Sequence, residues 1–583
     1  MKSLNSLARH WAQLRGTADA FILLGPDNVE KERLSFHDLH HVSAHLAQEM
    51  RSHVPAGARV LLMFETGLAF VLAFFACHRA GLIPVPVVPI RKGRMRDAAI
   101  SVAMDCQPGL LVGPADQVAA ARQAFAGESS LASASLMELE FSSLMQRYRD
   151  EPIRASAIGK DETAIAFLQY TSGSTGAPKG VQVSQANLFA NLEMQRLAMK
   201  NPWGAVYVGW APLYHDMGLI ANILEPFYLG GQCILMPPAQ MAQSPWLWLK
   251  AISTYRAHTS GGSNFAYDLC IARSRRIAQE TLDLSCWKVA FNSAEPVRAD
   301  TVQEFCETFR GFGFNSEAMF PCYGMAEATL LISGGGEQRR PVITKISRSG
   351  LAQGLVEAPR DAEDEKFLVG CGCALTGERI AIVDPQNLSE LPQARVGEIW
   401  VSGDHIPAGY WQNELASADT FHAHTGGLTR QLRYLRTGDL GFMRDGEIYI
   451  TGRIKDVLIV RGRNVYPQDL ERIAQRAFPG LGEGAAAAFQ VGHERLALVV
   501  EVDRSLRNKF DGAAATKAIR EAVMHEFELS LHEIGFLAPA SIPLTTSGKV
   551  RRSETMRRFE QGQLSFLQAM QATDRSNAHM EPV

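Results

Sequence analysis

The chain has 583 residues, of which 46% are apolar and 20% are charged, and its formal net charge is −3. This length exceeds what one hydrophobic core supports, so two or more domains of an ordinary soluble protein are expected. The small net charge excludes a general electrostatic attraction to nucleic acid or to anionic membranes.

The cysteines and the apolar runs favour a cytoplasmic protein. None of the nine cysteines forms a CxxC pair, which favours a reducing compartment, and we interpret Cys371 and Cys373 as part of a packed loop in preference to a metal or redox site. No secretory signal is apparent, and the apolar run 67–77 is too short to cross a membrane.

The first part of the chain alternates helix patterns with short β-rich runs. Ser35 is placed to cap a helix running to about Met50, and strands are predicted at 59–64 and 83–88 with a buried helix between them. A strand–helix–strand connection of this length implies a parallel sheet. The cycle recurs around Leu110, Ala164, Tyr207, Gln232 and Lys288. We therefore predict an α/β fold for the large N-terminal domain, with layered, mostly parallel sheets and helices.

The helix after Ser35 carries His37, His41 and His45 at spacings of four residues. This spacing suits a metal site, but no nearby carboxylate or cysteine completes one, and the face opposes the apolar stripe. A solvated helix face is the preferred interpretation.

From Glu378 onward the pattern changes to short strands and turns. Runs at 379–384, 397–402 and 447–451 predict a small β unit that closes the large domain. We place the boundary so that residues 1–454 form the large domain and residues 455–583 form a small, mobile α+β domain. In the small domain we expect strands at 457–460, 485–491 and 497–502, helices at 467–477 and 513–528, and a frayed tail after Ser565.

The most informative segment is 170–180, YTSGSTGAPKG, which follows an apolar run. Its glycines let the backbone approach a ligand, and its N–H groups, hydroxyls and lysine match the charge of a polyphosphate. The spacing differs from that of the P-loop motif. From composition alone, a flexible connection is the alternative.

This segment resembles the phosphate loop of the adenylate-forming superfamily, which includes acyl-CoA synthetases, luciferases and peptide-synthetase adenylation domains. Further segments match in the family's order, at 210–218 (WAPLYHDMG), 292–296 (NSAEP), 323–329 (YGMAEAT), 434–439 (YLRTGD), 452–456 (GRIKD) and 546–549 (TSGK). The sequences of segments 258–267, 323–331 and 397–410 are most similar to those of fatty acyl-AMP ligases.

The resemblance implies ATP and Mg²⁺ as cofactors and a two-step reaction. A medium- or long-chain fatty acid is activated to acyl-AMP, and the acyl group then passes to the phosphopantetheine thiol of an acyl carrier protein. A fatty acyl-CoA synthetase is the alternative enzyme. A catalytically silent acyl-nucleotide-binding module is a third possibility, against which the joint presence of Lys179, Glu327, Asp439 and Lys549 argues.

The resemblance also implies roles for individual residues. Around the nucleotide it places Thr171, Ser172, Gly173, Ser174, Thr175, Gly176 and Lys179 at the phosphates and Ser293, Ala294, Glu295 and Tyr323 near adenine. Asp439 would bind the ribose, Arg453 would lie over ribose or phosphate, and Gly324, Met325 and Ala326 are further nucleotide-binding positions. Glu327 would hold Mg²⁺, Lys549 would bridge the substrate carboxylate and the α-phosphate, and Lys455 would be the hinge. Ala326 departs from the threonine that is usual in the superfamily and cannot donate to a phosphate. Ordinary alternatives remain, such as a core aromatic for Tyr323 and a solvated surface for Arg453.

On the acyl side, Trp210, His215, Met217 and Phe265 lie in motifs that border the substrate site in relatives. Such a wall supplies apolar area, worth about 0.8 kcal/mol per buried methylene. No dedicated partner for a substrate ammonium is visible, which favours a fatty acid over an amino acid. His215 is interpreted as a gating or carboxylate-facing catalytic residue, with a packed imidazole as the alternative.

The segment 344–368 has little apolar periodicity and several charges. A long surface loop is one interpretation, although loops of this length are uncommon unless they are functional or disordered. The segment falls where fatty acyl-AMP ligases carry an insertion that is thought to restrain the small domain and to disfavour transfer to coenzyme A.

Overall fold

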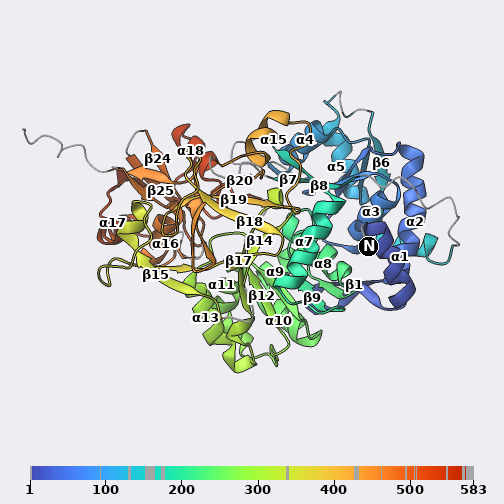
Figure 1. Ribbon diagram of the computed structural model, residues 1–583, viewed down its shortest axis with the longest axis horizontal. Coiled ribbons are helices and arrows are strands. Elements are labelled where there is room, and N and C mark those ends of the chain that lie inside the picture. Colours follow the sequence, from blue (N-terminus) through green and yellow to red (C-terminus); the bar gives the residue numbers. More distant parts are fainter. Residues whose placement is uncertain are drawn as a thin grey trace, which may run out of the picture.

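The structure is a computed structural model, with the N-terminal helices at one end and residues after 455 at the other (Figure 1). It describes residues 3–91, 94–128, 131, 133–151, 164–171, 178–335, 340–425, 432–460, 462–482, 484–492, 495–504, 506, 509–545, 549–567 and 571–572. The predicted phosphate-loop residues Ser172, Gly173, Ser174, Thr175 and Gly176 lie outside the described residues, as does most of the tail after Ser565.

The largest sheet has the strand order β17–β14–β13–β12–β11–β9–β10–β1–β2. The run from β13 to β1 is parallel, whereas β14 and β17 at one edge and β2 at the other are antiparallel. The strands are β1 (Asp19–Leu24), β2 (Glu30–Ser35), β9 (Val206–Gly209), β10 (Gln232–Leu235), β11 (Thr259–Gly262), β12 (Val289–Asn292), β13 (Met319–Gly324), β14 (Leu331–Gly334) and β17 (Cys373–Ala374). The predicted strands near Tyr207, Gln232 and Lys288 are thereby confirmed.

Helices cover both faces of this sheet, and the parallel strands are apolar on both sides for that reason. One buried cluster joins Val208 and Ala290 of the sheet to α10, α11 and α13, and another joins Phe21 and Tyr207 to α2 and α3. The helices of this region are α1 (Leu4–Arg15), α2 (Phe36–His53), α3 (Leu68–Arg79), α7 (Gln185–Ala198), α8 (Glu225–Tyr228), α9 (Pro238–Gln243), α10 (Pro245–Thr254), α11 (Asn264–Ala272), α12 (Ser274–Ile277) and α13 (Ala299–Phe309).

A second sheet near the N-terminus is parallel throughout, with the order β4–β3–β5–β6. Its strands and helices are β3 (Arg59–Met63), β4 (Ile83–Val87), β5 (Leu110–Gly113), β6 (Ser135–Glu138), α4 (Arg94–Cys106), α5 (Ala115–Phe125) and α6 (Phe141–Tyr148). The hydroxyl of Ser35 accepts a hydrogen bond from the backbone N–H of Asp38 at 3.0 Å and so caps α2, as predicted.

The strand predicted near Ala164 does not join a parallel sheet. It is β7 (Ile165–Thr171), which pairs antiparallel with β8 (Lys179–Ser184). The physical reason is the short connection between the two strands, because only antiparallel neighbours can be joined by so few residues. The predicted phosphate loop therefore connects two antiparallel strands.

The prediction of a solvated histidine face on α2 is wrong for His45. This side chain is only 5% exposed, and its ring stacks on Tyr148 with 5.2 Å between the centroids. Its Nε2 also lies 2.9 Å from the carbonyl oxygen of Glu151. Helix α6, which is distant in sequence, packs across this face of α2, and the periodicity of α2 alone did not reveal it.

Short antiparallel strands follow, as predicted, in the order β18–β19–β20–β21. They are β18 (Glu378–Val383), β19 (Gly397–Gly403), β20 (Leu435–Arg444) and β21 (Glu447–Arg453), with α15 (Glu414–Phe421) beside them. Segment 344–368 also contains regular structure. Most of β15 (Ile343–Ser347) and β16 (Glu365–Val369) lies in it, these strands pair antiparallel, and α14 (Arg348–Ala352) lies between them.

Residues after 455 have a hydrophobic core of their own, built around Leu470, Leu498 and Ile519. The elements are β22 (Leu458–Val460), β23 (Arg463–Val465), α16 (Pro467–Ala477), β24 (Ala486–Val491), β25 (Arg495–Glu501), α17 (Gly512–Phe527), β26 (Leu531–Leu537), α18 (Arg552–Glu560) and β27 (Gln571–Ala572). The predicted strands and helices are all present within a few residues of their expected bounds. Within the described residues, no helix has the length and apolar character needed to span a membrane.

Candidate active site

The predicted nucleotide-binding residues gather at the carboxyl ends of the parallel strands. Ser293 follows β12, and Tyr323 and Gly324 end β13, which lies beside it. The backbone N–H of Ser293 donates to the carbonyl oxygen of Gly262 at the end of β11, at 3.0 Å. Ligands of open α/β sheets bind outside this edge. Ala294 has a φ of 75°, a strained conformation for a residue with a side chain.

Asp439 is held by two donors. The hydroxyl of Tyr323 donates to its Oδ2 at 2.7 Å, and Nε of Arg453 donates to its Oδ1 at 2.8 Å. Asp439 and Arg453 face each other across β20 and β21, and Tyr323 reaches them from the large sheet. The carboxylate is 5% exposed, whereas half of the Arg453 side chain is accessible. The negative charge of Asp439 raises the pKa of Arg453, which is therefore fully charged.

Glu327 lies in a tight turn directly after β13. Gly324 begins this turn, and a Cβ at that position would meet the carbonyl oxygen of Leu330 at 1.9 Å, so only glycine fits. Thr329 ends it with a φ of 66°, which is strained for a β-branched residue, and its hydroxyl donates to the carbonyl oxygen of His405 at 2.7 Å. Strain held in place by surrounding contacts is common at functional sites.

The carboxylate of Glu327 points toward polar neighbours. Its Oε1 accepts from the hydroxyl of Tyr410 at 3.2 Å. Burial raises the pKa of Glu327, while the nearby Arg453 opposes this shift and Asp216 adds to it. A half-buried acid whose charge is disfavoured in the free protein gains most when a cation arrives.

Lys179 and Thr171 close the predicted phosphate loop. They face each other across the β7–β8 pair. The ammonium of Lys179 lies 4.8 Å from the centre of the Tyr410 ring, a cation–π contact. Because Tyr410 also donates to Glu327, it connects the base of the phosphate loop to the predicted magnesium ligand.

Lys549 comes from the small domain but lies among charges of the large one. Burial lowers the pKa of its ammonium, Arg453 lowers it further, and the carboxylates of Asp216, Asp439 and Glu295 oppose the shift. Its side chain is nevertheless accessible to solvent. The Lys549 ammonium therefore lies within electrostatic reach of Asp216, Asp439 and Arg453, although it belongs to the region after residue 455.

The acyl-side residues occupy varied positions. His215 and Asp216 precede a π-helical turn at Met217–Leu224, and Oδ1 of Asp216 lies 2.5 Å from Nδ1 of His215. Although burial would raise the pKa of Asp216, this contact with His215 lowers it, so Asp216 is ionised. Trp210 is buried and Met217 packs against a buried cluster, but Phe265 is 51% exposed at the start of α11.

The remaining predicted residues flank this arrangement. The backbone N–H of Phe265 donates to Oε1 of Glu295 at 3.4 Å. Met325 is half-buried and Ala326 is buried in the turn that carries Glu327. Lys455 lies outside the site, in an exposed turn just after β21.

Ion pairs tie the two domains together in this arrangement. Nζ of Lys366 on β16 lies 2.5 Å from Oδ2 of Asp469 on α16, and Nη1 of Arg348 on α14 lies 2.5 Å from Oε1 of Glu526 on α17. Lys366 and Arg348 both belong to segment 344–368, in which α14 contacts β23 of the small domain and β16 contacts α13. That segment is therefore in direct contact with the small domain.

Arg552 links the segment of Lys549 to the turn that contains Lys455. Its guanidinium makes two bonds of 2.7 Å to the carboxylate of Glu471 and one of 3.0 Å to Oδ2 of Asp456. Asp456 directly follows Lys455, and Arg552 stands three residues after Lys549. A bidentate pair of this kind fixes both distance and orientation.

Sequence reasoning missed several of these residues. Tyr410 closes the motif 397–410, but nothing in the pattern showed that it would reach Lys179 and Glu327. The bridge between Val181 on β8 and Tyr410 brings them together, and this long-range contact has no local signal. Arg552 was visible in the basic run after Lys549, but its acidic partners lie far away in sequence.

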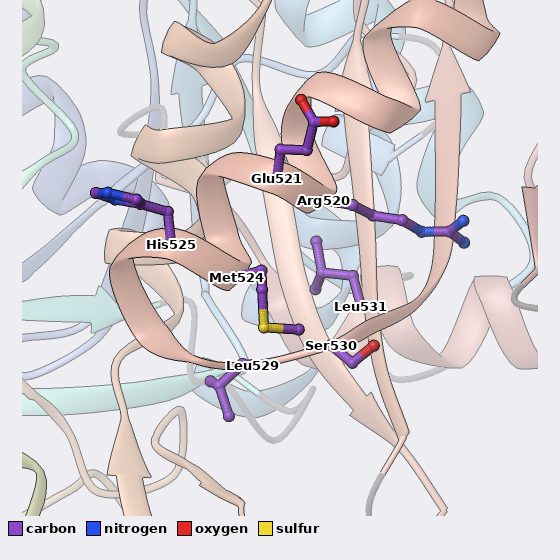
Figure 2. Close-up of a pocket in the computed structure, with 7 residues that line it drawn as sticks. All are labelled: Arg520, Glu521, Met524, His525, Leu529, Ser530 and Leu531. Atoms are coloured by element: carbon purple, nitrogen blue, oxygen red, sulfur yellow. The ribbon is translucent and has the colours of Figure 1, made fainter. Parts of the chain in front are cut away.

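A groove of about 450 Å³ lies elsewhere, on the small domain, between the end of α17 and β26 (Figure 2). Its lining includes Arg520, Met524 and Leu531, and none of the predicted site residues contributes to it. The groove is therefore separate from the candidate active site.

Comparison with known proteins agrees with this geometry. A family model described as "AMP-binding enzyme" matches residues 8–411, and one described as "Disco-interacting protein 2-like, AMP domain" matches residues 455–569. The chain belongs to the AMP-binding enzyme family, the adenylate-forming superfamily expected from the sequence, and within it to the group of fatty acyl-AMP ligases.

Individual relatives cover nearly the whole chain. The medium-chain-fatty-acid–[acyl-carrier-protein] ligase JamA of Moorena producens is 34% identical, over 99% of this chain and 98% of its own. The ligase of the same description from Teredinibacter turnerae, TtuA, is 34% identical, over 93% and 91%.

Solved structures give the same result. A structure from studies of the fatty acyl-adenylate ligases of E. coli and L. pneumophila has a TM-score of 0.84 at 31% identity and covers 96% of this chain and 98% of that one. The fatty acyl-adenylate ligase of L. pneumophila in complex with acyl adenylate and pyrophosphate has a TM-score of 0.72 at 34% identity, with 98% of each chain covered.

Proposed function

We propose that this protein activates a medium- or long-chain fatty acid with ATP and passes the acyl group to the phosphopantetheine thiol of an acyl carrier protein. In the first step a carboxylate oxygen of the acid attacks the α-phosphorus of ATP. The bond from that phosphorus to the bridging oxygen of the β-phosphate breaks, and pyrophosphate leaves. Two anions meet in this step, so positive charge and alignment are what the protein has to supply.

The observation that carries the proposal is the meeting of charges from both domains at one edge of the sheet. Lys549 of the small domain lies within the influence of Asp216, Asp439 and Arg453 of the large one. A cation at this position would stabilise the charge that develops between carboxylate and α-phosphate. Asp439 would accept from ribose hydroxyls, and Tyr323, which is buried beside Asp439 and bonded to it, would adjoin the adenine.

The donor set at Glu327 fits Mg²⁺. The ion prefers oxygen ligands and is usually held by one or two carboxylates together with substrate phosphates. Glu327 has one oxygen bonded to Tyr410, and its charge is disfavoured by burial until a cation compensates it. Among the described residues no cluster of three or more potential ligands forms a dedicated metal cage, so ATP would supply the other oxygens. When bound, Mg²⁺ would neutralise phosphate charge.

The relatives support an acyl acceptor, and the cysteines support a cellular location. Relatives described as acyl-carrier-protein ligases support a carrier protein as the acceptor. All nine cysteines of the chain are free thiols in the structure, which supports a reducing cytoplasm as the location.

Two measurements test the proposal. ATP–pyrophosphate exchange should depend on a fatty acid, and its absence with every chain length would refute adenylation. The products formed with coenzyme A and with a phosphopantetheinylated carrier should then be compared. Transfer to the carrier is expected to dominate, whereas efficient acyl-CoA formation would favour the synthetase alternative.

A further inference from the structure

The turn that carries Glu327 has a rare backbone conformation at Thr329. Its φ is 66° and its ψ is −65°, and the N–H of Leu330 donates to the carbonyl oxygen of Ala328 at 2.8 Å. These values define a γ-turn of the strained kind, with a positive φ at the central residue. The conformation is costly for a β-branched residue, so contacts outside the turn have to hold it.

The side chain of Thr329 supplies one such contact. Thr329 is fully buried, and its hydroxyl donates to the carbonyl oxygen of His405 at 2.7 Å. His405 is fully buried as well. A buried hydroxyl and a buried carbonyl that separate from each other lose their hydrogen bond without water to replace it. The bond therefore favours the γ-turn over an ordinary backbone conformation.

The acceptor of this bond is held in place by the start of α7. Nδ2 of Asn187 donates to the carbonyl oxygens of Asp404 at 2.7 Å and Ile406 at 3.0 Å, which flank the carbonyl of His405. The side-chain oxygen of Asn187 accepts from the N–H and the hydroxyl of Ser184, in the capping box of α7. One amide therefore joins the capped end of α7 to the turn around His405.

A second amide of α7 holds the other side of the γ-turn. Asn191 lies four residues after Asn187, so the two side chains share a helix face. Its Nδ2 donates to the carbonyl oxygen of Leu331 at 2.8 Å, and its Oδ1 accepts from the N–H of Leu331 at 3.1 Å. Asn191 is fully buried, and Leu331 begins β14 directly after the γ-turn. The amide thus pairs with Leu331 as a neighbouring strand would.

The same helix is connected to the predicted phosphate loop. Strand β8 begins at Lys179, and α7 follows β8 without a gap. Tyr410 forms a second connection, because it bridges to Val181 of β8 and donates to Oε1 of Glu327 at 3.2 Å. The position of Glu327 relative to Lys179 is therefore set by contacts that a shift of the γ-turn would break.

We propose that Thr329, Asn187 and Asn191 are positioning residues for Glu327, the predicted magnesium ligand. The inference rests on the proposed function and deepens it. The bonds of these three side chains would fix the turn of Glu327 before Mg²⁺ and ATP arrive, so that little ordering remains for the binding step. Mg²⁺ demands near-ideal octahedral geometry. A carboxylate displaced by relaxation of the γ-turn should therefore contribute less to its binding.

The test measures ATP binding by calorimetry without fatty acid, once in EDTA and once with Mg²⁺. The ratio of the two Kd values isolates what Mg²⁺ adds to binding. Thr329→Val keeps the β-branched shape but loses the hydroxyl, and it should lower this ratio up to about tenfold. That factor equals about 1.4 kcal/mol, the size of one buried hydrogen bond. Thr329→Ser keeps the hydroxyl and should preserve most of the ratio.

Thr259→Val is the matched control. Thr259 is also fully buried, and its hydroxyl also donates at 2.7 Å, to Oδ1 of Asn201. It begins β11, whereas the candidate active site lies at the carboxyl ends of the parallel strands. The control should lose a similar amount of stability, seen as a lower Tm, but its ratio should equal that of the wild type.

A second variant keeps the test decisive if Thr329→Val does not fold. Asn187→Asp retains an oxygen to accept from Ser184 but loses the donor to residues 404 and 406, so it should lower the ratio too. A wild-type ratio in Asn187→Asp or in folded Thr329→Val overturns the inference, as does an equal fall in the Thr259 control. Wild-type protein whose ATP affinity does not respond to Mg²⁺ would instead refute the magnesium role of Glu327 within the proposed function.

Discussion

The contacts between segment 344–368 and the small domain lead to a quantitative prediction about acceptor choice. The pair Lys366–Asp469 has side-chain exposures of 15% and 24%, and the pair Arg348–Glu526 has exposures of 22% and 38%. Partly exposed pairs contribute up to about 1 kcal/mol each. Loss of both should therefore destabilise the present domain arrangement by about 1–2 kcal/mol, which corresponds to a roughly 5- to 30-fold change in its population.

The perturbation is the double variant Lys366→Ala with Arg348→Ala, and the assay is the ratio of acyl-CoA to acyl-AMP formed with coenzyme A present. If these pairs restrain the small domain, the ratio should rise by about the same factor, up to 30-fold, as the rotated arrangement becomes more populated. Lys345→Ala is the matched control, because Lys345 pairs with Glu365 inside the same β-hairpin at 2.9 Å.

A second variant excludes a trivial loss of folding. Exchange of the charges, Lys366→Asp together with Asp469→Lys, should restore much of the original ratio, because the pair is rebuilt with opposite polarity. If the double alanine variant forms acyl-AMP normally and its acyl-CoA ratio equals that of the Lys345 control, the restraint does not arise from these contacts.

Four further outcomes are expected. Lys549→Ala should slow adenylation about 10²- to 10³-fold while ATP affinity stays nearly constant, and a near-normal exchange rate would refute its role. Lys455→Pro should impair domain rotation, so unchanged rates in both half-reactions would exclude this hinge. Arg552→Lys keeps the charge but loses the bidentate geometry to its two carboxylates, so single-turnover adenylation should fall about tenfold at saturating ATP, and an unaltered rate would rule out a positioning role. Burial raises the pKa of Glu378, which lies 3.3 Å from His405, to about 8, so the folded state keeps a proton that the unfolded chain loses above its ordinary pKa. Stability should therefore decline as pH rises toward about 8, and Glu378→Gln should abolish the decline, seen as a Tm advantage over wild type that is larger near pH 8 than near pH 5.

Local signals were sufficient for most of the fold. The strands on either side of α3 and the capped helix after Ser35 were predictable because apolar periodicity and capping act within a few residues. The β7–β8 hairpin was misassigned, because an apolar run alone does not reveal the direction of its partner. The prediction that His45 is exposed was wrong for a related reason, because its burial depends on Tyr148, which belongs to a separate helix.

For the candidate site too, sequence reasoning predicted some residues and missed others. Motif resemblance identified four site residues, Tyr323, Glu327, Asp439 and Lys549. Their spacing in sequence did not give their positions in space. Tyr410 became apparent only when Val181 was seen to pair with it. Long-range contacts of this kind depend on how whole elements pack.

The two hydrogen bonds that Asp439 already accepts affect how a nucleotide would bind. Both of its oxygens already have donors, Tyr323 on one side and Arg453 on the other. Each carboxylate oxygen can accept about two hydrogen bonds, so both oxygens keep a lone pair for a ribose hydroxyl. The two donors hold the carboxylate in one orientation before a nucleotide arrives. Little free energy would therefore be lost in ordering this acceptor when a ribose binds.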